Sequence, residues 1–106
     1  MAKKITTIDY KEWLLEQLRD PHEAQGFLEV VFEEYEKDGD TKTFLLCIRD
    51  VVEAQGGIGK LVRKTKLSRQ HLYKVLSSRG NPQMSTILSI MNALGFQISI
   101  KLKKAA

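Results

Sequence analysis

Apolar side chains recur at the spacing of an α-helix through almost all of this 106-residue chain and change to the spacing of a strand only near its end. From residue 10 to residue 94 they repeat at helical intervals, which gives each segment one face suited to a buried core. After Gly95 they repeat at every second position. The chain is therefore predicted to be all-α, with about six helices and a C-terminal β-strand.

Capping residues divide the first half into three helices. Asp9 is a suitable N-cap for the first helix, and Pro21 ends that helix and can open the next, over residues 22–37. Gly39 closes the second helix, and Asp40 caps a third that ends at Gly56 and Gly57. The predicted inward residues are Tyr10, Trp13, Leu14 and Leu18 in the first helix, Phe27, Leu28, Val31 and Tyr35 in the second, and Phe44, Leu45, Ile48, Val51 and Val52 in the third.

Residues 58–77 have the pattern of a helix-turn-helix. The first helix is expected to end near Thr65, and Ser68 is a strong N-cap for the second. Two helices joined by so short a turn can cross steeply, so that the first braces on the DNA backbone while the second enters the major groove. The expected inward residues are Ile58, Leu61, Thr65, Leu67, Leu72 and Val75.

A loop and a last helix follow. Gly80, Asn81 and Pro82 indicate a loop, Ser85 is expected to cap the last helix, and Gly95 to stop it. The residues of this helix expected to face the core are Ile87, Leu88, Met91 and Leu94.

The end of the chain is predicted to be a half-buried strand, because Phe96, Ile98, Ile100 and Leu102 alternate with polar residues. A lone strand cannot satisfy its backbone hydrogen bonds. Its partner is either the segment 4–8 or, as we favour, the same strand of a second subunit in a homodimer. The expected division is an arm at 1–8, an acidic helical hairpin at 9–39, a helix-turn-helix domain at 40–95 and a dimerisation strand at 96–106.

Charge divides the chain into two unlike halves. Residues 1–56 hold all 13 acidic residues against 7 basic ones, whereas residues 57–106 hold 10 basic residues and no acidic one. The net charge of +4 therefore conceals −6 in the first half and +10 in the second. A stretch of this length without a carboxylate is suited to approach polyanionic phosphate. The alternative is an ordinary solvated basic face.

The exposed side of the second motif helix carries the candidate base readers. Arg69 and Gln70 stand in its first turn, nearest the base edges, where Arg can pair with guanine and Gln with adenine. Tyr73 and Lys74 follow one turn later. The phosphate contacts are expected from Gly59, Lys60, Ser68, His71, Arg79 and Asn81. Arg63, Lys64 and Lys66 could equally be solvated surface.

Catalysis is not indicated. The chain has two histidines and one cysteine, with no Gly-rich phosphate loop and no metal-ligand spacing, so no enzyme, cofactor or metal is expected. Cys47 lies in an apolar segment and is expected to fill the core. No apolar run approaches the roughly 20 residues that span a bilayer, and the N-terminus lacks the apolar stretch of a signal peptide, which favours a cytoplasmic protein.

Four stretches carry a resemblance to a known family: LSRQHLYKVLS at 67–77, GNP at 80–82, STIL at 85–88 and NALGF at 92–96. Their order and spacing resemble the lambda-repressor-like helix-turn-helix class, and specifically the small probable addiction module antidote proteins of bacterial toxin-antitoxin loci. The resemblance covers roughly residues 9–100. It departs from the class at Lys66, where Gly is usual, and at Val62, where Ala is usual. Lys66 would need a strained left-handed backbone unless the turn differs.

The resemblance implies an antitoxin that represses its own operon on double-stranded operator DNA and neutralises a cognate toxin, typically a small RelE-like ribonuclease. The acidic residues Glu29, Glu33, Glu34, Glu36 and Asp38 could meet a basic toxin, or could only solubilise a helix. A stand-alone helix-turn-helix regulator of phage or host origin is the first alternative. A protein-interaction module is the second, and it would show no salt-dependent affinity for DNA.

Overall fold

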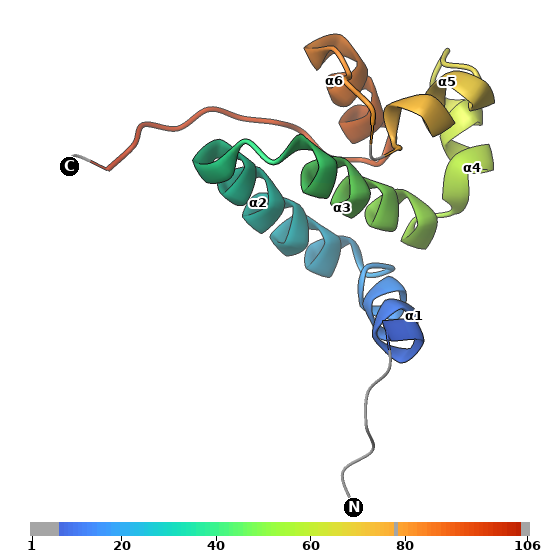
Figure 1. The fold of residues 1–106 in the computed structure, drawn as a ribbon, viewed down its shortest axis with the longest axis horizontal. Coiled ribbons are helices and arrows are strands. Elements are labelled where there is room, and N and C mark those ends of the chain that lie inside the picture. The colour runs from blue at the N-terminus through green and yellow to red at the C-terminus, as the bar shows by residue number, and fades with distance from the viewer. Residues whose placement is uncertain (1–6, 78, 105–106) are drawn as a thin grey trace, which may run out of the picture.

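The computed structural model describes residues 7–77 and 79–104, and these residues form six α-helices (Figure 1). The helices are α1 (Thr7–Gln17), α2 (Pro21–Asp38), α3 (Thr41–Ala54), α4 (Gly57–Lys64), α5 (Arg69–Val75) and α6 (Met84–Ala93). Figure 1 shows α2 and α3 side by side as an antiparallel pair, with α1 at one end of the pair and the group of α4, α5 and α6 beyond α3. The mainly helical prediction is confirmed for these residues.

The boundaries of α2 and α3 follow from side-chain caps. The Asp20 carboxylate accepts a hydrogen bond from the His22 N–H at 2.8 Å, and Pro21 takes the first helical position. Gly39, with φ of 64°, ends α2 by donating its N–H to the Tyr35 carbonyl. Asp40 then begins α3 by accepting from the Thr43 N–H at 3.1 Å. The predicted caps at Gly39 and Asp40 are therefore confirmed.

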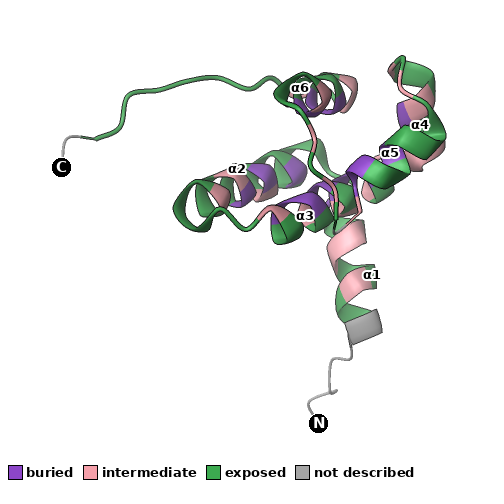
Figure 2. Cartoon of the chain, turned by 45° about the horizontal axis from the view of Figure 1, so that its top comes forward, coloured by how far each residue is buried: buried purple, intermediate pink, exposed green. Residues whose placement is uncertain are grey.

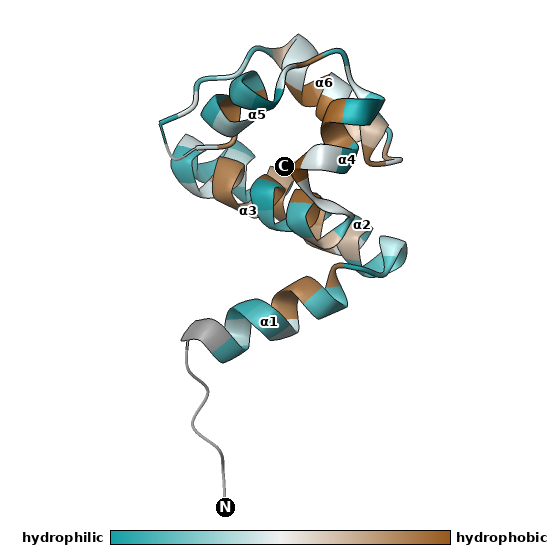
Figure 3. Cartoon of the chain, turned by 90° about the vertical axis from the view of Figure 1, so that its right-hand side faces the viewer, coloured by the Kyte–Doolittle hydropathy of each residue, from teal (hydrophilic) through white to brown (hydrophobic). Residues whose placement is uncertain are grey.

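One apolar core joins all six helices. Figure 2 shows that the buried residues lie on the sides of the helices that face one another, and Figure 3 shows the apolar residues gathered there, with hydrophilic residues prominent on the outside of α5. All five predicted inward residues of α3 are buried. Phe44 packs between Phe32 and Tyr35 of α2, at ring-centroid distances of 5.0 and 4.5 Å. Burial of α3 therefore fixes the position of its C-terminal end, after which α4 begins.

The first helix differs from its prediction at its start and on its inner face. It begins at Thr7 instead of after Asp9, and Tyr10 and Trp13 are about half exposed, with their rings 5.9 Å apart. The helix is held to α3 near its end, where Leu18 is buried, and by Lys11, whose ammonium lies 2.7 Å from Asp50. Because the apolar contacts of α1 lie toward its end, at Leu14 and Leu18, the rings of Tyr10 and Trp13 stay about half in solvent. The part of the predicted arm at 1–6 lies outside the described residues.

The last helix begins two positions earlier than predicted. Gln83 takes the N-cap position, with no side-chain hydrogen bond, so Ser85 lies inside α6. Ile90 is fully buried, whereas Leu88 is 45% exposed, which corrects the prediction that Leu88 faces the core. Gly95, with φ of 91°, ends the helical segment as predicted.

The C-terminal segment is extended but is not a strand within this chain. Residues 96–104 pair with no other described segment, and only the Phe96 N–H bonds back, to the Met91 carbonyl at 2.8 Å. The physical reason is that strand formation needs a partner backbone, and Thr7 and Ile8 of the predicted alternative partner belong to α1. Phe96 is half-buried against the core, while Ile98, Ile100 and Leu102 are exposed. Among the described helices, none is long and apolar enough to cross a membrane.

Candidate nucleic-acid interface

A four-residue connection, Thr65–Ser68, positions α5 against α4. The Thr65 hydroxyl donates to the Leu61 carbonyl at 2.9 Å and accepts from the Leu67 N–H at 3.3 Å. Ser68 then begins α5 by accepting from the His71 N–H at 3.0 Å, as predicted. The turn is therefore built from side-chain hydroxyl groups at both of its ends.

The turn resolves the expected strain at Lys66. No non-glycine residue among those described has a positive φ, so Lys66 keeps an ordinary backbone. Thr65 is extended, with φ of −115° and ψ of 170°, and its hydroxyl holds the next two residues in place. The second departure, Val62, is half-buried against the core. The chain has thus adopted a different turn from the glycine-based one.

The outer side of α5 is polar and exposed. Leu72 and Val75 are buried on its inner side, and the residues predicted as base readers, Arg69, Gln70, Tyr73 and Lys74, are all exposed. The side chains of Ser68 and His71, at the start of α5, are exposed as well. This helix therefore offers one continuous polar side that is available to a ligand.

Gly59 and two arginines lie together where α4 meets α5. A β-carbon added at Gly59 would lie 3.5 Å from Nη2 of Arg69 and 3.8 Å from Nη1 of Arg63. Arg63, for which a DNA contact and solvated surface were equally expected, thus has its guanidinium beside that of a predicted base reader. Neither arginine makes an ion pair with the part of the chain that is described. The two like charges would be drawn together most readily by an anion.

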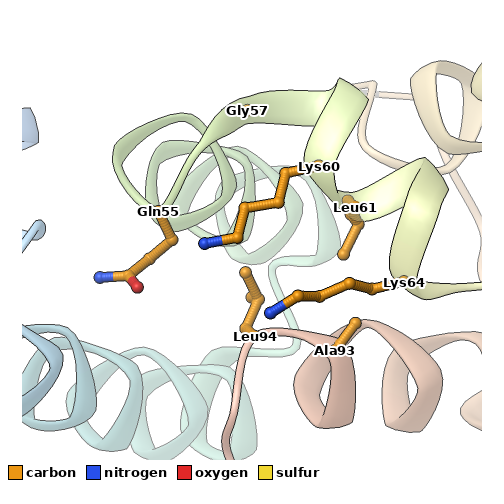
Figure 4. A pocket seen from close by; sticks show the side chains of 7 residues that line it. All are labelled: Gln55, Gly57, Lys60, Leu61, Lys64, Ala93 and Leu94. Atoms are coloured by element: carbon orange, nitrogen blue, oxygen red, sulfur yellow. The ribbon is translucent and has the colours of Figure 1, made fainter.

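Lys60 lies in a different place from this arginine pair. Figure 4 shows Lys60 and Lys64 directed into a hollow between α4 and α6, beside Gln55 and Leu94. The ends of α3 and α6 lie at this hollow, and cations are stabilised by the partial negative charge of helix C-termini. The structure therefore separates Lys60 from Gly59, although the two are neighbours in sequence and were both predicted to contact phosphate.

The loop after α5 is held close to that helix by a glycine. A β-carbon at Gly80 would collide with the carbonyl group of Val75, and it would lie 3.1 Å from Leu45. The Gly80 N–H donates to the Ser77 carbonyl at 3.0 Å. This close approach fixes the path of the chain, and Arg79 and Asn81, on either side of Gly80, are exposed.

The two halves of the chain differ in how their charges are used. The ion pairs found in the described ranges, 7–77 and 79–104, all join residues between Lys11 and Glu53. The cations of residues 57–104 make none with these parts of the chain. Because repulsion among neighbouring cations is relieved by an external anion, this surface is suited to a polyanion.

The described residues include no group of three or more His, Cys, Asp or Glu side chains that could hold a metal ion. Burial raises the pKa of the Cys47 thiol, which opposes formation of the nucleophilic thiolate. Cys47 is half-buried against the core, in agreement with its prediction as a core residue.

The chain matches the model of one protein family, described as probable addiction module antidote protein, over residues 7–102. An uncharacterized protein of Haemophilus influenzae is 29% identical to it over 91 residues, which are 86% of this chain and 89% of that relative. No solved structure matches the chain.

Proposed function

The chain belongs to the probable addiction module antidote family, and we propose that it is the antitoxin of a type II toxin-antitoxin module that also represses its own operon. In this proposal, α4 and α5 form a helix-turn-helix that binds double-stranded operator DNA. The protein also neutralises a cognate toxin, a RelE-like ribonuclease. Family membership supports the antitoxin role, and the DNA-binding role rests on the surface of α4 and α5.

The observation that carries the DNA-binding proposal is the outer side of α5, which is exposed, polar and free of acidic residues. A helix of this kind, braced by a second helix across a short turn, can enter the major groove. Arg69 and Gln70 then face guanine and adenine, each with a discrimination of about 1–3 kcal/mol for a good bidentate pair. Tyr73 and Lys74 contact bases or phosphates one turn further along.

Phosphate contacts position this helix on both sides. On one side, Gly59 lets the DNA backbone approach the start of α4, and Arg63 adds charge beside Arg69. On the other side, Arg79 and Asn81 extend from the loop that Gly80 holds in place. Ser68 and His71 contact the phosphates nearest the start of α5. Lys60 instead lies beside the C-terminal ends of α3 and α6 and contributes less to DNA binding.

In this proposal, the toxin binds the acidic N-terminal half of the molecule. The acidic residues of α2 named above are exposed, and those toxins that bind RNA carry basic surfaces that would complement them. The proposed homodimer places two copies of α5 on half-sites about one helical turn apart, and the C-terminal residues Phe96, Ile98, Ile100 and Leu102 contribute to its interface.

The proposal is tested by measuring the protein's affinity for the DNA upstream of its own reading frame, using fluorescence anisotropy at several salt concentrations. We expect affinity to fall steeply with salt. Arg69→Ala and Gln70→Ala should relax sequence preference at one or two base pairs, whereas Arg79→Ala should weaken binding to all sequences and lower the salt slope by about one. Lys42→Ala, an exposed lysine on α3, is the control and should change neither.

Two results would contradict parts of the proposal. Affinity that does not depend on salt would favour a protein-interaction module over a DNA-binding protein. Specific DNA binding without any toxic partner encoded beside this chain would instead favour a stand-alone regulator. Co-purification with a small basic protein encoded beside this chain, and loss of that protein's toxicity on co-expression, would support the antitoxin role.

A further inference from the structure

A groove of about 520 Å³ runs between α2 and the C-terminal segment. Its floor is apolar, formed by Leu28 and Phe32 of α2, Met91 of α6, and Phe96. One wall is the outer side of α2 and the other is the chain from Gly95 to Lys101. The volume lies within the range of about 300–1,000 Å³ typical of binding pockets. The groove can therefore take several side chains of an extended segment.

The α2 wall of the groove carries unpaired negative charge. Glu29, Glu33 and Glu36 line it, and all three are exposed. None makes an ion pair within residues 7–77 and 79–104, and Glu29 only accepts a hydrogen bond from the Gln25 amide at 3.1 Å. An apolar floor beside unpaired carboxylates fits a segment that combines apolar side chains with lysines.

The C-terminal segment of this same chain has that chemistry. Ile100 and Leu102 are 99% and 96% exposed, and they alternate with Lys101 and Lys103, which are exposed and make no ion pair with the described parts of the chain. Figure 2 shows the segment reaching away from the helices, and its residues 97–104 are exposed. Covering these two side chains with a partner would remove apolar surface from water and is therefore favourable.

We propose that the groove of each copy receives residues 98–103 of a second copy of this chain. The lengths agree: α2 rises about 17 Å from Gln25 to Glu36, and residues 98–103 span about 17 Å when extended. Lys101 and Lys103 are about 7 Å apart along such a segment, close to the rise of about 6 Å between Glu29 and Glu33. The partner's Ile100 and Leu102 reach the floor, and its lysines reach the carboxylates on the rim.

A second copy fits better than an unrelated basic protein because the exchange is reciprocal. Each copy offers both the groove and the segment, so a two-fold axis fills both grooves at once and covers both pairs of exposed apolar side chains. The extended segment that forms one wall also has backbone groups with no backbone partner in the described residues, and an incoming chain can bond to them. The inference rests on the homodimer of the proposed function and assigns it a receptor site on α2.

Sedimentation velocity of the full chain, with charge reversals on each side of the contact, tests the inference. Glu29→Lys/Glu33→Lys and Lys101→Glu/Lys103→Glu should each raise the dissociation constant of the dimer by at least about tenfold, because every contact becomes like-charged. Mixing the two variants should restore a dimer, since each groove then meets a segment of opposite charge. Glu12→Lys/Glu16→Lys makes the same change on exposed residues of α1, away from the groove, and should leave the dimer intact.

The outcomes separate this inference from the proposed function. A groove variant that stays dimeric overturns the inference, and if it also loses affinity for the neighbouring basic toxin, the groove belongs to the toxin. A wild-type chain that is monomeric overturns both the inference and the proposed homodimer, while salt-dependent DNA binding would still stand. Circular dichroism of each variant confirms that the helices are retained, and restoration on mixing cannot arise from misfolded chains.

Discussion

The guanidinium of Arg69 lies over Gly59, so close that a β-carbon at Gly59 would be 3.5 Å from Nη2 of that arginine. This distance is an ordinary van der Waals contact, and Gly59 has no positive φ, so alanine fits the folded protein. We expect Gly59→Ala to raise the free energy of unfolding by about 0.5–1 kcal/mol, because glycine is unfavourable inside a helix. The same variant should bind DNA more weakly, because its methyl group obstructs a phosphate at the start of α4.

Gly26→Ala provides the control for this pair of effects. Gly26 lies on the exposed side of α2 with nothing within 4 Å of an added β-carbon. Gly26→Ala should stabilise the protein by a similar amount and leave the affinity for DNA unchanged. Urea denaturation and anisotropy titrations measure the two quantities. Full DNA affinity in Gly59→Ala would remove Gly59 from the phosphate contacts.

Gly80→Ala should destabilise the protein, in contrast to the two substitutions above. The added methyl group would collide with the Val75 carbonyl, which is backbone and cannot move without shifting α5. Forcing atoms into a packed site costs about 1–3 kcal/mol. Chemical denaturation measures this loss, and a stability equal to that of the wild type would show that the loop after α5 is free to move.

Gln55 ties the end of α3 to the end of α1. Its side-chain amide donates to the Leu18 carbonyl at 2.6 Å and to the Arg19 carbonyl at 3.1 Å. Gln55→Ala should lower the free energy of unfolding by about 1–2 kcal/mol, because it leaves the carbonyl of buried Leu18 unsatisfied. Gln25→Ala removes an exposed amide that bonds only to Glu29 and should change stability by less than about 0.5 kcal/mol. Equal effects in the two variants would argue against a structural role for Gln55.

The caps that could be predicted from sequence are those that depend on local hydrogen bonds. Gly39, Asp40 and Ser68 each act through a residue within four positions, so the pattern of nearby residues was sufficient. The start of α6 could not be found in this way, because Gln83 makes no side-chain cap and Ser85 was a better local candidate. Leu88 and Ile90 are both apolar, so only the packing of α6 decides that Ile90 is buried and Leu88 is exposed.

In the candidate interface, too, the features that depend on local sequence could be predicted, and those that depend on tertiary packing could not. The exposure of Arg69, Gln70, Tyr73 and Lys74 follows from helical periodicity, which the sequence displays directly. The proximity of Arg63 to Arg69 depends on how α4 crosses α5, and the direction of Lys60 depends on where α6 ends. Both features depend on tertiary packing, and no pattern of nearby residues in the sequence indicates them. The C-terminal segment shows the same limit, since alternation predicts an extended chain but not its partner.

Asp40 makes the stability of α3 depend on pH in the acid range. The Thr43 hydroxyl, which donates to its carboxylate at 2.7 Å, and the Thr43 N–H hold the pKa of Asp40 below its ordinary value of 3.8. Because the folded-state pKa is the lower one, the stabilisation is fully present above pH 3.8 and is lost as pH falls through the folded-state pKa. Thr43→Val removes the hydroxyl and should reduce the part of the free energy of unfolding that is lost at acid pH. Asp40→Asn should abolish that part. Urea unfolding between about pH 6 and about pH 2 measures the difference from wild type. If that difference stays constant over this range for both variants, Asp40 does not titrate as a helix cap.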